Sequence, residues 1–163
     1  MIDIVEYSTV HADGVVDLIL PIQQSEFNLP VTLDAQPDLQ NIPGFYQHGT
    51  GNFWVALDGN KVIGSVALLD IENYEVALRK MFVSARYRGQ EHMVSSRLLD
   101  EALRWCGSNG VRQVYLGTTA QFFAAHRFYE KNGFSEINKT SLPKTFPIMS
   151  VDTKFYRRET IGA

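Results

Sequence analysis

The middle of the chain reads as a strand, a helix and a second strand in direct succession, and this unit constrains the fold most. Apolar residues such as Leu98 and Leu99 recur at helical spacing and predict an amphipathic helix over residues 92–106. Hydrophobic runs at 74–83 and 111–116 predict the flanking strands. Because a helical crossover joins strands that run in the same direction, these two strands should be locally parallel.

Antiparallel pairing is predicted elsewhere, beginning with a hairpin about the turn Asp58-Gly59-Asn60, whose residues tolerate positive φ. Further strands are expected at residues 2–7, 134–137 and 149–157. A first helix should begin at a Thr9 cap and kink or end at Pro21. Further helices are expected at residues 33–40, at 43–48 and at 120–131, the last with Thr118 or Thr119 as its cap. Together they predict one domain over residues 1–163. Its α/β (α+β) fold would have a mixed, mostly antiparallel sheet, one locally parallel pair and helices on both faces.

The strand over residues 74–83 carries a change of phase. Apolar side chains mark one face as far as Leu78, but Met81 and Val83 continue out of step. Since side chains alternate with period two, one extra residue must be absorbed near Arg79-Lys80, and a β-bulge does this. The alternative is a strand buried on both faces, in which the phase carries little information.

The turn between this strand and the helix reads Arg86-Tyr87-Arg88-Gly89. A helix start exposes unpaired backbone N–H groups and carries partial positive charge, so it is a ready anion site. Arg86 and Arg88 add fixed cations, and Gly89 allows the backbone to approach a ligand closely. We therefore expect this junction to hold a phosphorylated cofactor.

Composition argues against several classes of protein. A formal net charge of −3 over 163 residues is not typical of a nucleic-acid binder. The single cysteine, Cys106, rules out an internal disulfide, and no Cys or His spacing suggests a metal site. Asp3 and Glu6 interrupt the N-terminal apolar residues, so no signal peptide is expected, and the apolar runs are too short for a membrane span. The expectation is a cytoplasmic protein without a metal, membrane or nucleic-acid partner.

Two motifs carry a resemblance to a known family. Residues 86–91, Arg-Tyr-Arg-Gly-Gln-Glu, match the first two landmarks of the pattern Gln/Arg-x-x-Gly-x-Gly/Ala and depart from the third. Residues 124–134, AAHRFYEKNGF, match a block of the form A-x-x-[LF]-Y-x-x-x-G-F. With both motifs in this order, the chain resembles the GNAT superfamily of acetyl-CoA-dependent N-acetyltransferases. The resemblance implies that the parallel strand pair is splayed.

The resemblance also implies a binding site for acetyl-CoA as cosubstrate, with the pantetheine arm paired to the strand backbone like an added strand. The implied contact residues are Met81, Phe82 and Val83 on the strand, Arg88, Gly89, Gln90, Glu91, His92, Met93, Val94 and Ser95 around the pyrophosphate, and Ala125 and Phe128 on the later helix. Extra residues around Gln90-Glu91 and the bulky Met93 set this loop apart from the usual pattern. Glu91 is expected to face solvent or cap the helix start.

Catalytic roles follow from the same resemblance. Tyr129 takes the tyrosine position of the second motif and would protonate the departing thiolate; its alternative role is that of an aromatic core residue. The family's frequent strand glutamate corresponds to Ala77 here. Glu75 is therefore the candidate that moves protons directly or through water, and its alternative role is a solvated strand carboxylate.

The implied reaction transfers acetyl directly to a primary amine of a small molecule, an amino acid or a peptide. Two alternatives remain open. One is a non-catalytic acyl-CoA-binding or regulatory module, and the other is a phosphate- or nucleotide-binding domain without acyl chemistry. The resemblance also allows a homodimer.

Overall fold

A seven-stranded sheet in the order β1-β2-β3-β4-β5-β7-β6 organises the molecule. The computed structural model describes residues 1–89, 91–120 and 122–160. The strands are β1 (Ile2–Glu6), β2 (Asn52–Asp58), β3 (Lys61–Asp70), β4 (Glu75–Val83), β5 (Gln113–Thr118), β6 (Ser135–Ile137) and β7 (Lys154–Glu159). The β4–β5 pair is parallel and the other neighbouring pairs are antiparallel, which confirms the predicted sheet.

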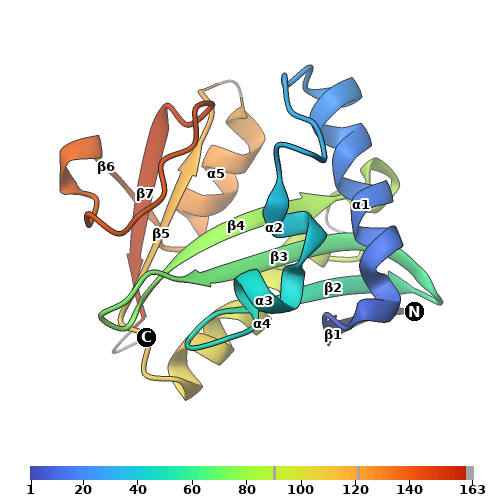
Figure 1. Ribbon diagram of the computed structural model, residues 1–163, viewed down its shortest axis with the longest axis horizontal. Helices are drawn as coiled ribbons and strands as arrows, with labels where there is room; N and C mark the ends of the chain where they lie inside the picture. Colours follow the sequence, from blue (N-terminus) through green and yellow to red (C-terminus); the bar gives the residue numbers. More distant parts are fainter. Residues whose placement is uncertain (90, 121, 161–163) are drawn as a thin grey trace.

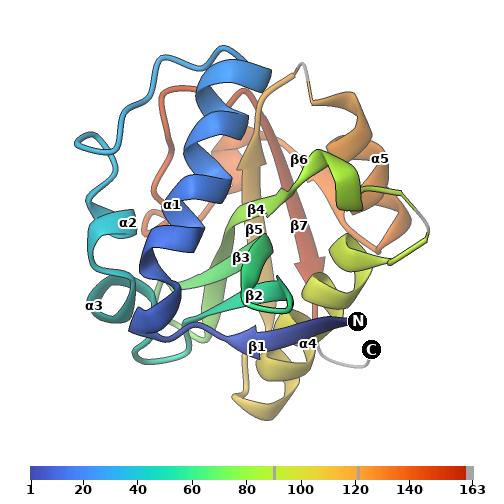
Figure 2. The same cartoon turned by 90° about the vertical axis from the view of Figure 1, so that its right-hand side faces the viewer.

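Helices cover both faces of the sheet, as predicted (Figures 1 and 2). They are α1 (Ala12–Pro21), α2 (Pro37–Gln40), α3 (Ile42–Tyr46), α4 (Val94–Ser108) and α5 (Phe123–Lys131), with short 3₁₀ turns at Thr9–His11, Ala85–Tyr87 and Lys139–Ser141. On one face, Ile19 of α1 and Tyr46 of α3 are fully buried in one hydrophobic core. On the other face, Leu98 and Leu99 of α4 share a second core with Tyr129 of α5.

The parallel pairing of β4 with β5 is short. It joins Glu75 to Gln113, Val76 to Val114 and Ala77 to Tyr115. Beyond these pairs the two strands diverge (Figure 1), while β5 stays paired with β7 as far as Thr118. The remainder of β4 therefore has a backbone edge that is not paired to β5, which is the splay that the family resemblance implies.

The predicted β-bulge is present in β4. Between two paired positions, β3 advances by two residues, from Ala67 to Ser65, while β4 advances by three, from Arg79 to Phe82. The extra residue is accommodated at Lys80, whose φ is 54°. The Ser65 hydroxyl donates a hydrogen bond to the Lys80 carbonyl at 2.7 Å and holds the bulge against β3.

α1 ends at Pro21, which confirms the predicted kink or end, but the chain does not leave the helical path there. The chain continues as a π-helix over Ile22–Glu26, in which the Phe27 N–H donates to the Ile22 carbonyl at 3.1 Å. Proline lacks the N–H that a regular α-helix requires, and the wider turn accommodates the missing bond. As a result, Glu26 and Phe27 are carried toward the open end of the β4–β5 pair.

The predicted threonine caps are wrong. Thr9 begins a 3₁₀ turn that precedes α1. Thr118 belongs to β5. Thr119 contacts the start of α5 through its backbone carbonyl and not through its hydroxyl. The Thr119 carbonyl oxygen lies 2.8 Å from Nε2 of the buried His126 and accepts a hydrogen bond from the Phe122 N–H. His126 thereby fixes this turn, and α5 begins three residues later than predicted, at residue 123.

The last strand begins at Lys154, so the prediction of a strand from residue 149 is also wrong. The Met149 N–H donates to the Asp152 carboxylate at 3.0 Å, and the Asp152 N–H donates back to the Met149 carbonyl at 3.0 Å. This turn satisfies the backbone locally and replaces the strand ladder. It also places the Met149 sulfur 3.7 Å from Nη2 of Arg79 on β4.

Candidate active site

A cleft of about 510 Å³ opens where β4 and β5 diverge. Of the residues that the sequence predicted, the cleft is lined by Met81, Phe82, Val83, Arg88, Gly89, Ser95, Ala125, Phe128 and Tyr129. The sequence did not reveal the remaining lining residues, which are Ile22, Phe27, Phe122, Phe123 and Ala124. The Phe27 and Phe122 rings lie 4.4 Å apart between centroids, so they join the π-helix to the start of α5 across the cleft.

The other described residues of the predicted phosphate loop do not line the cleft. Gln90 is outside the described residues. Glu91 is 86% exposed and points into solvent, with its carboxylate 3.9 Å from Nε2 of His92. Met93 has a left-handed φ of 53° directly before α4, and Val94 is buried in the core below the helix.

The junction between the loop and α4 has the geometry of an anion site. Gly89 adopts a φ of 99°, and a Cβ built on it would meet nothing within 4 Å. The first N–H groups of α4 have no partner within the helix and carry the positive end of its dipole. Ser95, in that first turn, faces the cleft. An anionic group at this end of the cleft would therefore be stabilised by backbone donors.

Arg88 ties the loop to the π-helix. Its Nε donates to the Val83 carbonyl at 2.9 Å, and its guanidinium binds both oxygens of Glu26, with the Nη2–Oε1 bond at 2.8 Å. The hydrogen bond from Arg88 lowers the pKa of Glu26 below its usual value. The Arg88 charge is thus engaged by Glu26 at the rim of the cleft.

Tyr129 lies in the wall of the cleft and is only 8% exposed. Its ring contacts those of Phe134 and Tyr156, with centroids 5.6 Å and 6.1 Å away. Within the described ranges, no hydrogen bond involves its hydroxyl, and burial raises the pKa of the phenol above its ordinary value. The hydroxyl is therefore protonated at neutral pH and available to a ligand in the cleft.

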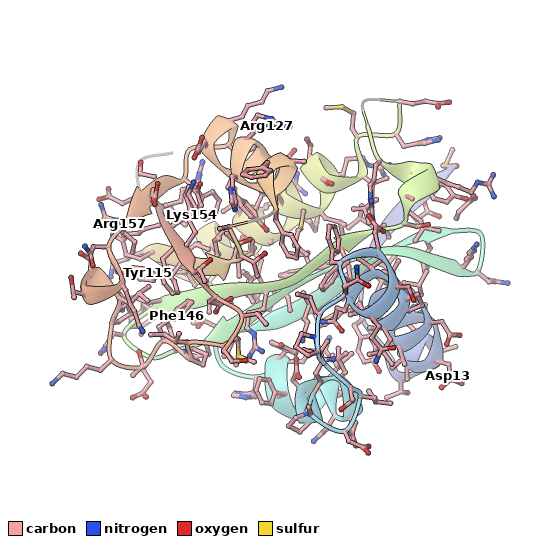
Figure 3. The ribbon with its side chains drawn as sticks, turned by 90° about the horizontal axis from the view of Figure 1, so that it is seen from above. Asp13, Tyr115, Arg127, Phe146, Lys154 and Arg157 are labelled. Carbon is pink, nitrogen blue, oxygen red and sulfur yellow. The ribbon has the colours of Figure 1, made fainter. Side chains whose placement is uncertain are left out.

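Glu75 is not brought to the cleft. It begins β4 at the end that pairs with β5, and its carboxylate accepts a hydrogen bond from the Tyr115 hydroxyl at 3.5 Å. Tyr115 packs with Phe146 in a separate small core, which Figure 3 shows at the end of the sheet away from α1. Direct contact between Glu75 and a ligand beside Tyr129 would require a different arrangement of β4.

Two further features of the described residues concern a metal site and a membrane-spanning helix. Across the described residues, no group of three or more His, Cys, Asp or Glu side chains gathers as a metal site would require. Over the same ranges, no helix combines the length and the apolar character that crossing a bilayer demands.

The chain is similar to proteins of known name. N-acetylaspartate synthetase from Danio rerio is 35% identical over 105 residues, which is 63% of this chain and 36% of the relative. The chain thus spans about a third of that relative's length. A crystal structure of a GNAT-family acetyltransferase from Staphylococcus aureus Mu50 is 37% identical, covers 98% of this chain and 99% of its own, and superposes with a TM-score of 0.94.

A more distant structure shares the fold. N-acetylglutamate synthase from Neisseria gonorrhoeae, solved with coenzyme A and N-acetyl-glutamate, is 14% identical, covers 98% of this chain and 35% of its own, and has a TM-score of 0.73. The model of the acetyltransferase (GNAT) family matches residues 17–134, which is well over half of the chain. The family match, the S. aureus structure and the splayed β4–β5 pair agree, and this chain belongs to the GNAT family of acetyltransferases.

Proposed function

We propose that this chain transfers the acetyl group of acetyl-CoA directly to a primary amine of a small molecule, an amino acid or a peptide. The observation that carries the proposal is the cleft between β4 and α5, which combines the strand edge left open by the splay, a helix N-terminus and the Tyr129 hydroxyl. Family membership supports it. So do the relatives named for N-acetylated amino acids and the distant structure solved with coenzyme A.

The cleft suits the parts of acetyl-CoA from one end to the other. The backbone of Met81, Phe82 and Val83 would pair with the amide groups of the pantetheine arm like an added strand. Apolar side chains such as Phe128 and Ala125 would cover the arm from α5. The pyrophosphate would lie against the loop at Gly89 and the first turn of α4, where backbone donors and the helix dipole favour negative charge.

Attack on the thioester needs a neutral amine. A lysine-like amine with a pKa of about 10.4 is neutral in roughly 1 molecule in 2,500 at pH 7, which corresponds to about 4.6 kcal/mol. Positioning of the two reactants can contribute roughly 7–11 kcal/mol. Orientation in the cleft can therefore offset the cost of deprotonation, and proton removal through water suffices. Glu75 stays our prediction for the residue at the far end of such a water chain.

The acetyl transfer forms one carbon–nitrogen bond and breaks one carbon–sulfur bond. The amine nitrogen bonds to the acetyl carbon, and the resulting oxyanion is stabilised by a main-chain N–H near Val83. The carbon–sulfur bond then breaks, and Tyr129 donates its proton to the departing thiolate. The amine loses a proton to solvent, and the Tyr129 phenolate is reprotonated from solvent before the next turnover.

The experiment measures binding and turnover separately. Calorimetry with acetyl-CoA should show one site per chain, and release of free thiol should be followed over a panel of primary amines. Thiol release that depends on the amine, with the N-acetylated product found by mass spectrometry, supports the proposal. Binding without amine-dependent release would identify a non-catalytic acyl-CoA-binding module instead, and absence of binding would contradict the cleft assignment. The cytoplasmic location, the single domain and the homodimer stay predictions.

A further inference from the structure

The β4 bulge delivers two adjacent cationic side chains to one face of the sheet. In a regular strand, successive side chains point to opposite faces. Here Lys80 has a φ of 54°, and both Lys80 Nζ and Arg79 Nη2 approach the same oxygen of Asp38, at 3.4 Å and 3.9 Å. This face is the one covered by α1, α2 and α3, and it lies opposite the core that contains Tyr129.

Lys80 and Asp38 are satisfied within the protein. The Lys80 ammonium donates to the Gln36 side-chain carbonyl at 2.6 Å, and the Asp38 carboxylate accepts a hydrogen bond from the Tyr46 hydroxyl at 2.6 Å. Both charged side chains are less than a tenth exposed. Their contacts form a closed network, as buried charges require.

Arg79 differs from its neighbour. Its side chain is only 13% exposed, and its guanidinium lies 5.7 Å from the ring centroid of Phe45. Its one hydrogen-bond contact among the described residues goes to the Met149 sulfur, a weak acceptor. The acidic groups that face it are Asp38 and Asp152, and neither accepts a hydrogen bond from it. A guanidinium has five N–H donors, and most of those on Arg79 have no hydrogen-bond partner among the described residues.

A second hollow adjoins the cleft and is lined in part by the loop that contacts Arg79 through Met149. Its volume is about 550 Å³, and it shares Phe123 with the cleft. Ser150, which follows the Met149 that contacts Arg79, lines it from the loop before β7. Thr119 also lines it, and the buried Thr119 Oγ1 has no hydrogen-bond partner among the described residues. A buried hydroxyl oxygen without a partner among the described residues thus belongs to a residue that lines this hollow.

We propose that Arg79 binds the carboxylate of the acceptor, so that the amine substrate is an amino acid or another amine that carries a carboxylate. The inference rests on the proposed N-acetyltransferase function. A planar carboxylate can accept two parallel hydrogen bonds from a guanidinium, which a weak sulfur contact does not compete with. The carboxylate held at Arg79 and the amine turned toward the β4–β5 gap would fix the orientation of the acceptor.

The test compares each amino acid with its own carboxamide. Kinetics of thiol release are measured for L-alanine, L-aspartate, L-glutamate and their α-carboxamides with the wild-type protein and with Arg79→Gln, Arg79→Lys and Arg104→Gln. Arg104 is an exposed arginine on α4 that is paired with Glu101, so its replacement is the matched control. Thermal unfolding and acetyl-CoA calorimetry on each variant verify the fold and the cofactor site.

Arg79→Gln should lower kcat/KM for the amino acids by about 10- to 150-fold, mainly through KM, the range expected for hydrogen bonds to a charged group. The carboxamides should change by less than about threefold, because they lack the charge that Arg79 pairs with. Arg79→Lys should restore part of the loss, and Arg104→Gln should behave as wild type. An equal loss for acids and amides, or a wild-type protein that uses only the amides, would overturn the proposal.

A binding measurement separates this inference from the proposed reaction. If no amine is acetylated, the transferase function fails, and the subsite is judged by titrating the same amino acids into protein saturated with coenzyme A. Binding to the wild type that is lost in Arg79→Gln would support the carboxylate site without the reaction. Absence of binding to the wild type, or equal binding to both proteins, would refute it.

Discussion

Replacement of Tyr129 by phenylalanine separates a catalytic hydroxyl from a structural one. The ring packs against Phe134 and Tyr156, and Phe128 lies beside it, so a phenylalanine keeps these contacts. Across the described residues, no hydrogen bond ties the Tyr129 hydroxyl to the protein, so its removal leaves no buried partner unsatisfied. We therefore expect the free energy of unfolding to change by less than about 1 kcal/mol.

The rate should fall much further than the stability. Proton transfer by a positioned side chain typically contributes about 10²- to 10⁴-fold, so kcat of Tyr129→Phe should drop by a factor in this range. The dissociation constant for acetyl-CoA should change by less than about threefold, since the hydroxyl acts when the thiolate departs. Burial raises the pKa of Tyr129. Its ionisation should consequently cause no loss of wild-type rate below about pH 10.

Tyr156→Phe is the matched control, because that hydroxyl donates to the Glu130 carboxylate at 2.7 Å in the same aromatic cluster. It should cost about 1–2 kcal/mol of stability and leave kcat nearly unchanged. Rates are measured as thiol release in single-turnover mixing, where chemistry limits the signal, and stability by denaturant unfolding. If Tyr129→Phe turns over at the wild-type rate under these conditions, the hydroxyl is a core group and the assignment of the proton donor is refuted.

Three further predictions concern the loop, its ion pair and the buried thiol. Gly89→Val forces a branched residue to a φ of 99°, which costs about 1–3 kcal/mol, so Tm should fall by several degrees while the protein stays folded. Calorimetry should show acetyl-CoA binding weakened at least about tenfold, and equal affinity would contradict the loop assignment. The pKa of Glu26 is lowered, so its pairing with Arg88 stabilises the fold at pH values above the ordinary glutamate pKa, and this stabilisation is lost as the pH falls through the lowered pKa. The Tm difference between wild type and Glu26→Gln should therefore shrink below about pH 4.3. A Tm difference that persists in acid would exclude this pair as its source. Burial raises the pKa of Cys106 to about 12, so iodoacetamide at pH 8 should leave the native thiol unmodified by mass spectrometry and label it once the protein is unfolded; rapid native labelling would show that the thiol is accessible.

The elements that the sequence predicted correctly are those with a strong local signal. Leu98 and Leu99 lie on the buried stripe of α4, and the Asp58-Gly59-Asn60 turn joins β2 to β3. The phase slip after Leu78 located the bulge because burial of one strand face enforces the register. In these segments, periodicity and turn chemistry decide the structure without help from distant parts of the chain.

The errors arise where tertiary contacts override local chemistry. The sequence predicts the end of α1 at Pro21 but not the π-helix that follows it, which carries Phe27 onto Phe122 and Glu26 onto Arg88. No local pattern announces these partners, since they lie more than 60 residues apart in sequence or on separate elements. For the same reason, the sequence located nine lining residues of the cleft but missed the wall formed by the π-helix and the start of α5.

The bulge in β4 lies between the cleft proposed for the cofactor and the face proposed for the acceptor. Without the extra residue, Arg79 and Lys80 would point to opposite faces, and Met81 would change faces with them. A non-glycine residue at the φ of 54° seen for Lys80 costs about 1–3 kcal/mol. The hydrogen bond from Ser65 to the Lys80 carbonyl and the contacts of Lys80 with Gln36 help to hold this conformation. The strained conformation of Lys80 therefore lies where β4 gives its backbone edge to the cleft and the Arg79 guanidinium to the opposite face, which is the arrangement that the two proposed substrates require.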